Sequence, residues 1–359
     1  MAQDITPEVT PETTPIVRES AQGSVFGTVI VGTAGVTLPP DILASLHIFD
    51  TVTQTDSTIT TPIESDLTYQ FSDVTITEGN YYLVSVTFGG RNYGSNPVIG
   101  DVDFPNIDMP ITVYETTTDP NVIGIMNMVV QIQPTQGVLG FTQVMQFSNQ
   151  SDRLYLGTNP LEDGRSITLD LNLPVGALVT DVMVLLGQEP VGADDGSFII
   201  DTSTFKLQYT EPIFPAQNYL LIINYVMPYE QDAVLEFPIG HRFIGEFRLL
   251  VSTDELAVTG QGFSSIGKQT VGDIEFSGYG ARYDLMPDDV IRYELSGRVA
   301  GVGEFPSSTP TSSRPVTAIS SDNLPLLILI LGFGITVIVV GGVLVINRRK
   351  NTPNLPKDM

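Results

Sequence analysis

Carboxylates are the side chains through which this chain could do chemistry. Its 359 residues include 41 acidic and 16 basic side chains, two histidines and no cysteine. Paired aspartates in loops can supply the six to eight oxygen ligands that calcium prefers. No cluster fits the D-x-[DN]-x-[DN]-G loop, however, and Asp-Asp-Gly is also common turn chemistry. The calcium candidates are Asp101, Asp103, Asp108, Asp194 and Asp195.

Nucleophilic and multi-histidine chemistry have little support in the sequence. The two histidines, His47 and His241, are too few for a multi-histidine metal site. A serine triad needs a histidine beside an activated serine, and no G-x-S-x-G motif is present. The absence of cysteine excludes disulfides and cysteine-ligated metals. We therefore expect no catalytic residue and no cofactor, with a hydrolase that uses two of the many carboxylates as the alternative.

One aromatic group could form either a ligand patch or part of a core. Tyr225 and Tyr229 stand on either side of Pro228, and Phe237 follows. The chain has no tryptophan, so a β-sandwich interior must be filled with tyrosine and phenylalanine. We therefore predict that these rings are buried.

The charge balance limits the partners. A net charge of −25 repels nucleic acids, whose binding depends on Lys and Arg displacing counterions from phosphates. Nucleic acid is therefore excluded as a partner. Metal cations or a basic protein surface would be attracted instead.

The elements that must position these residues repeat with a period of two. In residues 81–88 every second side chain is apolar, and in residues 166–173 the leucines are expected to point inward and Thr168 outward. Such alternation is typical of antiparallel sheets with one face on a core. Together with turn signals such as Asp163-Gly164, it predicts a mainly β fold with two antiparallel, Ig-like β-sandwich domains.

Composition divides the chain into six segments. Thr, Pro and acidic residues dominate the start, and Pro, Ser and Thr dominate a stretch before the apolar C-terminal segment. A Thr-rich interruption separates two apolar regions near residue 118. The predicted segments are a disordered acidic leader (1–22), a first sandwich (23–118), a second β domain (119–298), a stalk (299–323), a transmembrane helix (324–346) and a basic tail (347–359).

Three short motifs mark the first domain: residues 23–29 have the form G-x-V-x-G-x-V, and residues 68–74 and 79–84 are similar to a Y-x-F-x-x-V and G-x-Y-x-V pair. With these motifs the first domain resembles the carboxypeptidase regulatory-like β-sandwich modules of bacterial envelope proteins. The chain departs from the pattern at Asp66-Leu67, where the family usually has a turn glycine, and in a Thr-rich insertion at 51–61. The resemblance implies an accessory, non-catalytic fold with glycines where strands turn.

The C-terminal apolar segment predicts a membrane anchor. Residues 324–346 carry no charge, and a helix of that length spans about 34 Å, enough for a hydrocarbon core of roughly 30 Å. A buried core helix is the alternative, but it would be shorter and would carry a polar face. The anchor is expected to run from Leu324 to Ile346, followed by the basic residues Arg348, Arg349 and Lys350.

The anchor predicts an orientation and a packing face. Cations on its C-terminal side place the tail in the cytoplasm and the bulk of the chain outside the cytoplasmic membrane. The N-terminus would then resemble that of a mature chain, with a signal peptide either removed or lost from the given sequence. A tail-anchored protein with a cytoplasmic globular part is the alternative. Gly334 and Gly341 share one helix face and could pack on another helix.

These expectations converge on a single-pass envelope protein of the cytoplasmic membrane. Its two β-sandwich domains would bind a protein or an envelope polysaccharide, or would serve as an accessory subunit of a membrane complex. The lipid bilayer is the further expected partner. A carboxylate-dependent hydrolase and a calcium-binding adhesion module are the alternatives.

Overall fold

The computed structural model describes residues 18–135, 138–186, 189–192 and 196–298. The chain divides into two compact units between Thr116 and Thr117, close to the predicted boundary after residue 118. The only helical element of the described residues is a single 3-10 turn, and the rest of their regular structure is strand. The predicted mainly β class is therefore confirmed.

Several predicted features lie outside the described residues. No helix in the described part of the chain combines the length and apolar character needed to cross a bilayer. The stalk (299–323), the anchor Leu324–Ile346 and the basic tail all fall outside this part. The same holds for the five residues singled out in and after the anchor: Gly334, Gly341, Arg348, Arg349 and Lys350.

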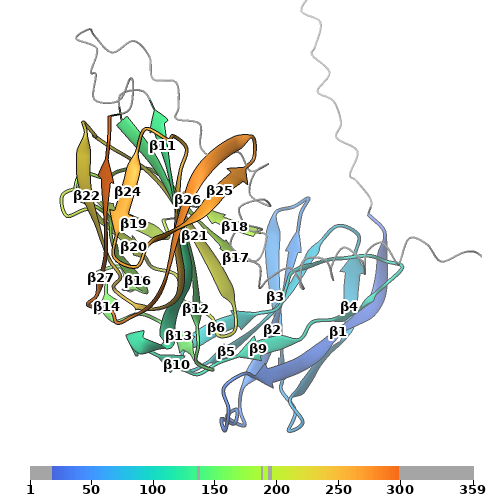
Figure 1. Ribbon diagram of the computed structural model, residues 1–359. Coiled ribbons are helices and arrows are strands. Elements are labelled where there is room, and N and C mark those ends of the chain that lie inside the picture. Colours follow the sequence, from blue (N-terminus) through green and yellow to red (C-terminus); the bar gives the residue numbers. More distant parts are fainter. Residues whose placement is uncertain (1–17, 136–137, 187–188, 193–195, 299–359) are drawn as a thin grey trace, which may run out of the picture. The chain divides into compact units, whose positions relative to one another are not determined.

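The first unit is built from two sheets, one with the order β4-β1-β8 plus β9 on β1, the other with the order β3-β2-β5-β6 plus β7 on β5. Both sheets contribute buried apolar side chains, for example Val25 and Val29 from one and Leu46 and Val84 from the other. The arrangement is therefore sandwich-like. The strands are β1 (Ser20–Val31), β2 (Leu43–Asp50), β3 (Thr55–Pro62), β4 (Thr68–Thr77), β5 (Tyr81–Phe88), β6 (Arg91–Gly94), β7 (Val98–Ile99), β8 (Asn106–Asp108) and β9 (Ile111–Val113) (Figure 1).

Two predictions about the first strand need correction. β1 begins at Ser20, inside the predicted leader, because residues 20–22 pair with residues 75–77 of β4. β1 also pairs in parallel with β8 and β9, so the predicted wholly antiparallel sheet is wrong. Gly23 and Gly27 lie within β1 rather than at turns. A Cβ on Gly23 would lie 1.9 Å from the carbonyl oxygen of Pro105, so this glycine permits a close approach of the backbone.

The two departures from the resembled family pattern have simple structural outcomes. Leu67 takes a φ of 67°, the left-handed conformation that a turn glycine would adopt more easily. Asp66 holds this turn, since its carboxylate accepts hydrogen bonds from the backbone N–H and the hydroxyl of Thr68. The Thr-rich insertion supplies β3, an exposed edge strand paired with β2.

The second unit places an eight-stranded sheet against two three-stranded sheets, among the described residues. The large sheet has the order β18-β17-β21-β12-β11-β23-β26-β25, and the smaller ones are β16-β20-β19 and β22-β27-β24 (Figure 1). β11 and β23 pair in parallel, a second exception to the antiparallel prediction.

The elements of the second unit follow in chain order. From residue 116 to residue 192 they are β10 (Thr116–Thr117, at the division), η1 (Pro120–Val122), β11 (Ile123–Thr135), β12 (Val138–Asn149), β13 (Leu154–Tyr155), β14 (Asn159–Pro160), β15 (Ser166–Ile167), β16 (Leu169–Asn172), β17 (Leu178–Leu186) and β18 (Glu189–Gly192). Those that follow are β19 (Phe198–Asp201), β20 (Lys206–Tyr209), β21 (Asn218–Met227), β22 (Asp232–Pro238), β23 (Arg242–Val251), β24 (Ala257–Gly260), β25 (Ser264–Val271), β26 (Ile274–Leu285) and β27 (Val290–Ser296).

One aromatic-rich core joins the large sheet to the smaller sheets. Phe141 and Tyr225 of the large sheet stack with ring centroids 4.9 Å apart. Phe237 and Tyr293 of a smaller sheet stack at 5.5 Å, and Phe247 lies near both of them. The prediction that Tyr225, Tyr229 and Phe237 are core residues is therefore confirmed, since all three are buried.

Thr168 corrects the predicted alternation of residues 166–173. It is 1% exposed rather than outward-facing. Its hydroxyl donates hydrogen bonds to the carbonyl oxygens of Tyr209 and Glu211, at 3.0 and 2.8 Å. These bonds satisfy a buried polar group where the strand is interrupted between β15 and β16.

Candidate functional site

The predicted calcium ligands do not form a cation site in the described part of the chain. The carboxylate of Asp101 accepts the backbone N–H of Asp103 at 2.9 Å, and Asp108 lies in β8. Among the described residues, no group of three or more Asp, Glu or His side chains is placed to hold a metal ion. Asp194 and Asp195 lie outside these residues. Asp101 thus supports a turn.

His47 is bound into the surface of the first unit. Its Nε2 lies 2.9 Å from the hydroxyl of Ser85 and its Nδ1 lies 3.1 Å from that of Thr58. All three residues lie on neighbouring strands, β2, β5 and β3. These bonds tie the sheet together, which is a structural role.

His241 lies in the short bend between β22 and β23 and is buried. It is 6% exposed, and neither ring nitrogen has a hydrogen-bond partner among the residues that the structure describes. Burial lowers the pKa of His241 to about 4, although the negative Asp170 nearby opposes this shift. The imidazole is therefore neutral at neutral pH.

This burial predicts a pH-dependent stability. Between pH 6.5 and 4 the unfolded chain binds a proton at His241 that the folded chain does not, so stability falls as the pH drops through this window. We expect the His241→Leu variant to lose about 2 kcal/mol less than the wild type between pH 7 and pH 4.5. Urea unfolding of both chains at the two pH values measures this difference. Equal losses in both chains would show that His241 does not titrate in this way.

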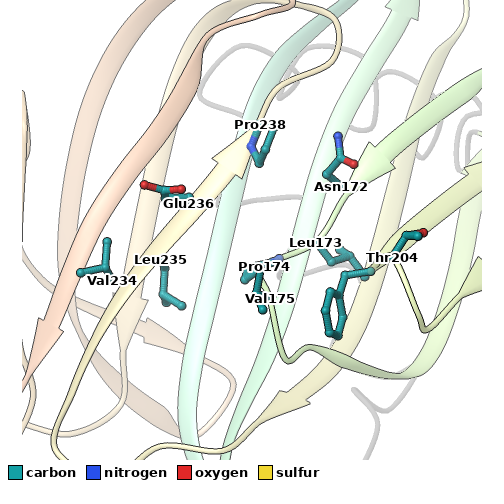
Figure 2. Close-up of a pocket in the computed structure, with 10 residues that line it drawn as sticks. Asn172, Leu173, Pro174, Val175, Thr204, Val234, Leu235, Glu236 and Pro238 are labelled. Atoms are coloured by element: carbon teal, nitrogen blue, oxygen red, sulfur yellow. The ribbon is translucent and has the colours of Figure 1, made fainter.

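A pocket of about 490 Å³ opens between the two three-stranded sheets of the second unit. Figure 2 shows its two walls, one formed by the edge strand β22 and the other by the end of β16 and the turn before β20. The first wall consists of Val234, Leu235, Glu236 and Pro238, and the second of Asn172, Leu173, Pro174, Val175, Thr204 and Phe205.

The two three-stranded sheets form one layer opposite the large sheet, and the pocket lies at the break between them. β16 and β22 are each the edge strand of their own sheet, and no hydrogen-bonded ladder joins them in the described structure. Their Cα atoms nevertheless come within 8 Å of each other. At the narrow end, a Cβ on Gly240 would lie 3.0 Å from the carbonyl oxygen of Asp170. The two edges therefore form a wedge that closes near His241 and opens toward Val234 and Val175.

Two ion pairs lie beside the wedge. Glu236 lies on one wall, and its carboxylate is 3.5 Å from the guanidinium of Arg292. Asp170 borders the narrow end, where its carboxylate accepts Lys206 at 3.1 Å. Both pairs are partly exposed, so each contributes little stability.

The lining of the pocket suits binding better than acid–base chemistry. Among the described residues that line it, Glu236 is the one ionisable side chain. A carboxylate-based glycosidase needs a second carboxyl group about 5 to 10 Å away. Most of the other lining residues are apolar, including Val175, which is 82% exposed, and Val234, which is 51% exposed.

Sequence reasoning did not single out any residue of this pocket. In the sequence, segments 172–175 and 234–238 have the pattern of ordinary strands and turns. They meet between two sheets that no ladder joins, and a sequence pattern does not predict such a contact. The one usable signal is proline at both borders, Pro174 and Pro238, because proline in a sheet is confined to edge strands and strand ends.

Comparison with known proteins does not place the chain in a family. No protein-family model and no curated protein matches it. Similar solved structures include an M1 zinc metallopeptidase from Deinococcus radiodurans, at a TM-score of 0.30 and 10% identity over 48% of this chain and 42% of that chain. They also include a mutant of a two-domain M1 zinc metallopeptidase bound to L-tryptophan, at a TM-score of 0.31 with the same identity and coverage. The chain thus spans less than half the length of these structures.

Proposed function

We propose that this chain is a non-catalytic binding protein of the cell envelope. Two β units would be held outside the cytoplasmic membrane by the segment Leu324–Ile346, with a short basic tail in the cytoplasm. They would bind a protein partner, which makes the chain an accessory subunit of a membrane complex, or an envelope polysaccharide.

The composition of the wedge-shaped pocket carries this proposal. The described residues that line it are mostly apolar, with Asn172 and Thr204 as neutral polar side chains and Glu236 as the single carboxylate. Specific binding uses apolar concave surfaces with a few polar groups. Catalysis by carboxylates would require a second acid near the first.

The charge and the anchor add to the proposal. The excess of 41 acidic over 16 basic side chains suits a surface that attracts basic partners. An uncharged segment of 23 residues followed by three cations suits a stable, oriented anchor. Together these features favour a partner that meets the protein at the membrane surface.

Affinity purification of the full chain from its own cells in mild detergent tests the proposal. We expect one defined partner at near-stoichiometric yield. The yield should fall in high salt, because salt screens the attraction between an acidic surface and its partner. A matched bait made of residues 299–359 alone identifies proteins that follow the anchor segment rather than the β units. Recovery of the full chain without a partner or a bound polysaccharide would contradict the proposal.

A further inference from the structure

We propose that the wedge between β16 and β22 binds an extended peptide segment of a partner protein. The segment would add as a strand to the free edge of β22 and would carry basic side chains on either side of an aliphatic one. This inference rests on the proposed binding function and names the class of partner for its pocket.

The first argument is the direction of the peptide groups on β22. The N–H of Ile239 donates to the carbonyl oxygen of Asp289 at 3.1 Å, which directs residue 239 toward β27. In an antiparallel ladder the direction alternates, so residues 237 and 235 point to β27 as well. The peptide groups of Val234 and Glu236 therefore face the pocket.

The opposite wall has the same property. The N–H of Leu173 donates to the carbonyl oxygen of Phe205 at 2.8 Å, on the β20 side. By the same alternation, the peptide groups of Asn172 point away from β20 and toward the pocket. Two strand edges thus present hydrogen-bonding groups to one space of about 490 Å³, a volume within the range of about 300 to 1,000 Å³ that is typical of ligand pockets.

The second argument is the pattern of side chains along β22. Asp232, Val234 and Glu236 are exposed and alternate with the buried Leu235 and Phe237. A strand added to this edge would place its own side chains opposite an acid, a valine and an acid. Opposite charges and apolar pairs are the favourable cross-strand neighbours, so the complementary segment alternates basic, aliphatic and basic residues.

The charge of the other wall agrees with this choice of partner. Lys206, the cation near the narrow end, is already paired with Asp170 and does not oppose a basic segment. Strand addition takes its affinity from main-chain hydrogen bonds and its specificity from alternate side chains. The wedge offers both.

Disulfide trapping tests the inference, because the chain contains no cysteine. The full chain with Val234→Cys, in mild detergent, is offered the peptide Gly-Lys-Val-Cys-Val-Lys-Gly. We expect it to form the mixed disulfide at least tenfold faster than with the peptide in which both lysines are glutamate. It should also react at least tenfold faster than with the peptide whose two lysines carry backbone N-methyl groups, because these groups remove N–H donors that would face β22 and keep both charges.

A matched control variant is Val290→Cys, on the neighbouring strand β27. Val290 is 46% exposed, close to the 51% of Val234, but it does not line the pocket. We expect the Val290→Cys variant to show no preference among the three peptides, and both variants to keep the thermal unfolding of the wild type. Equal trapping of all three peptides by Val234→Cys, or equal trapping at both positions, would overturn the inference.

Two other occupants give distinct results. β27 ends at Ser296, which pairs with Asp232 at the open end of the wedge, and the chain continues beyond it. An intramolecular disulfide in a Val234→Cys, Val302→Cys double variant would assign the wedge to this continuation of the chain, and a disulfide-linked dimer of Val234→Cys would assign it to a second copy. Either would overturn the partner assignment. The affinity purification that tests the proposed function does not depend on this pocket. If it recovers a partner but Val234→Cys traps no peptide preferentially, the proposed function stands and the peptide-binding inference is contradicted.

Discussion

Replacing Gly23 by alanine is expected to unfold the first unit. A Cβ at this position would lie 1.9 Å from the carbonyl oxygen of Pro105 and 2.6 Å from its carbon, both in the backbone next to β8. Neither atom can move as a flexible side chain would, so the parallel pairing of β1 with β8 must be given up. Gly27→Ala meets the carbonyl of Met109 at 2.5 Å and is expected to act in the same way. We expect a loss of at least about 3 kcal/mol for Gly23→Ala, the upper end of overpacking costs.

Hydrogen exchange of the full chain measures this loss unit by unit. Peptides from residues 18–116 should exchange much faster in Gly23→Ala, whereas those from residues 117–298 should keep their protection. Gly94→Ala is the matched control, because its Cβ would meet the nearest atom, of Leu83, at an ordinary 3.6 Å. If Gly23→Ala were as stable as Gly94→Ala, the close approach of β8 to β1 would be wrong.

Replacing Phe247 by alanine is expected to cost the second unit about 3 to 5 kcal/mol, the usual range for a buried phenylalanine. Phe247 is fully buried on β23, which pairs with both β11 and β26. Its ring lies 5.5 Å from that of Phe263 and 6.1 Å from that of Tyr293, so its loss leaves a cavity between the two layers.

Urea unfolding followed by circular dichroism measures this effect. Phe104→Ala is the matched control, because Phe104 is 73% exposed and its removal should change stability by less than about 0.5 kcal/mol. A Phe247→Ala variant with a stability close to that of the wild type would show that the large sheet and the smaller sheets do not share this core.

The strand alternation predicted the fold class but not the pairing of strands. Residues 81–88 alternate as predicted, with Tyr82, Val84, Val86 and Phe88 buried. Alternation reports which face a side chain occupies and not the direction of the neighbouring strand. The parallel pairs of β1 with β8 and of β11 with β23 were therefore beyond sequence reasoning. Strand β21 shows no alternation of burial, because residues 221–225 are all buried, on both faces of the large sheet.

Buried polar side chains were the least predictable part of the molecule. Thr168 and His241 are polar by type, and a strand or turn pattern places them at the surface. Their burial follows from contacts distant in sequence, with the carbonyl groups of Tyr209 and Glu211 for Thr168 and with the region of Asp170 for His241. The wedge is unpredictable for the same reason, because residues 172–175 and 234–238 meet only in the folded unit.

The orientation of the β units at the membrane is the central claim, and protease treatment of intact cells tests it most directly. We predict that added protease removes residues 18–298, while a C-terminal tag after Met359 stays protected and the anchored fragment resists extraction by alkaline carbonate. Survival of both β units on intact cells, or release of the chain by carbonate, would contradict the account.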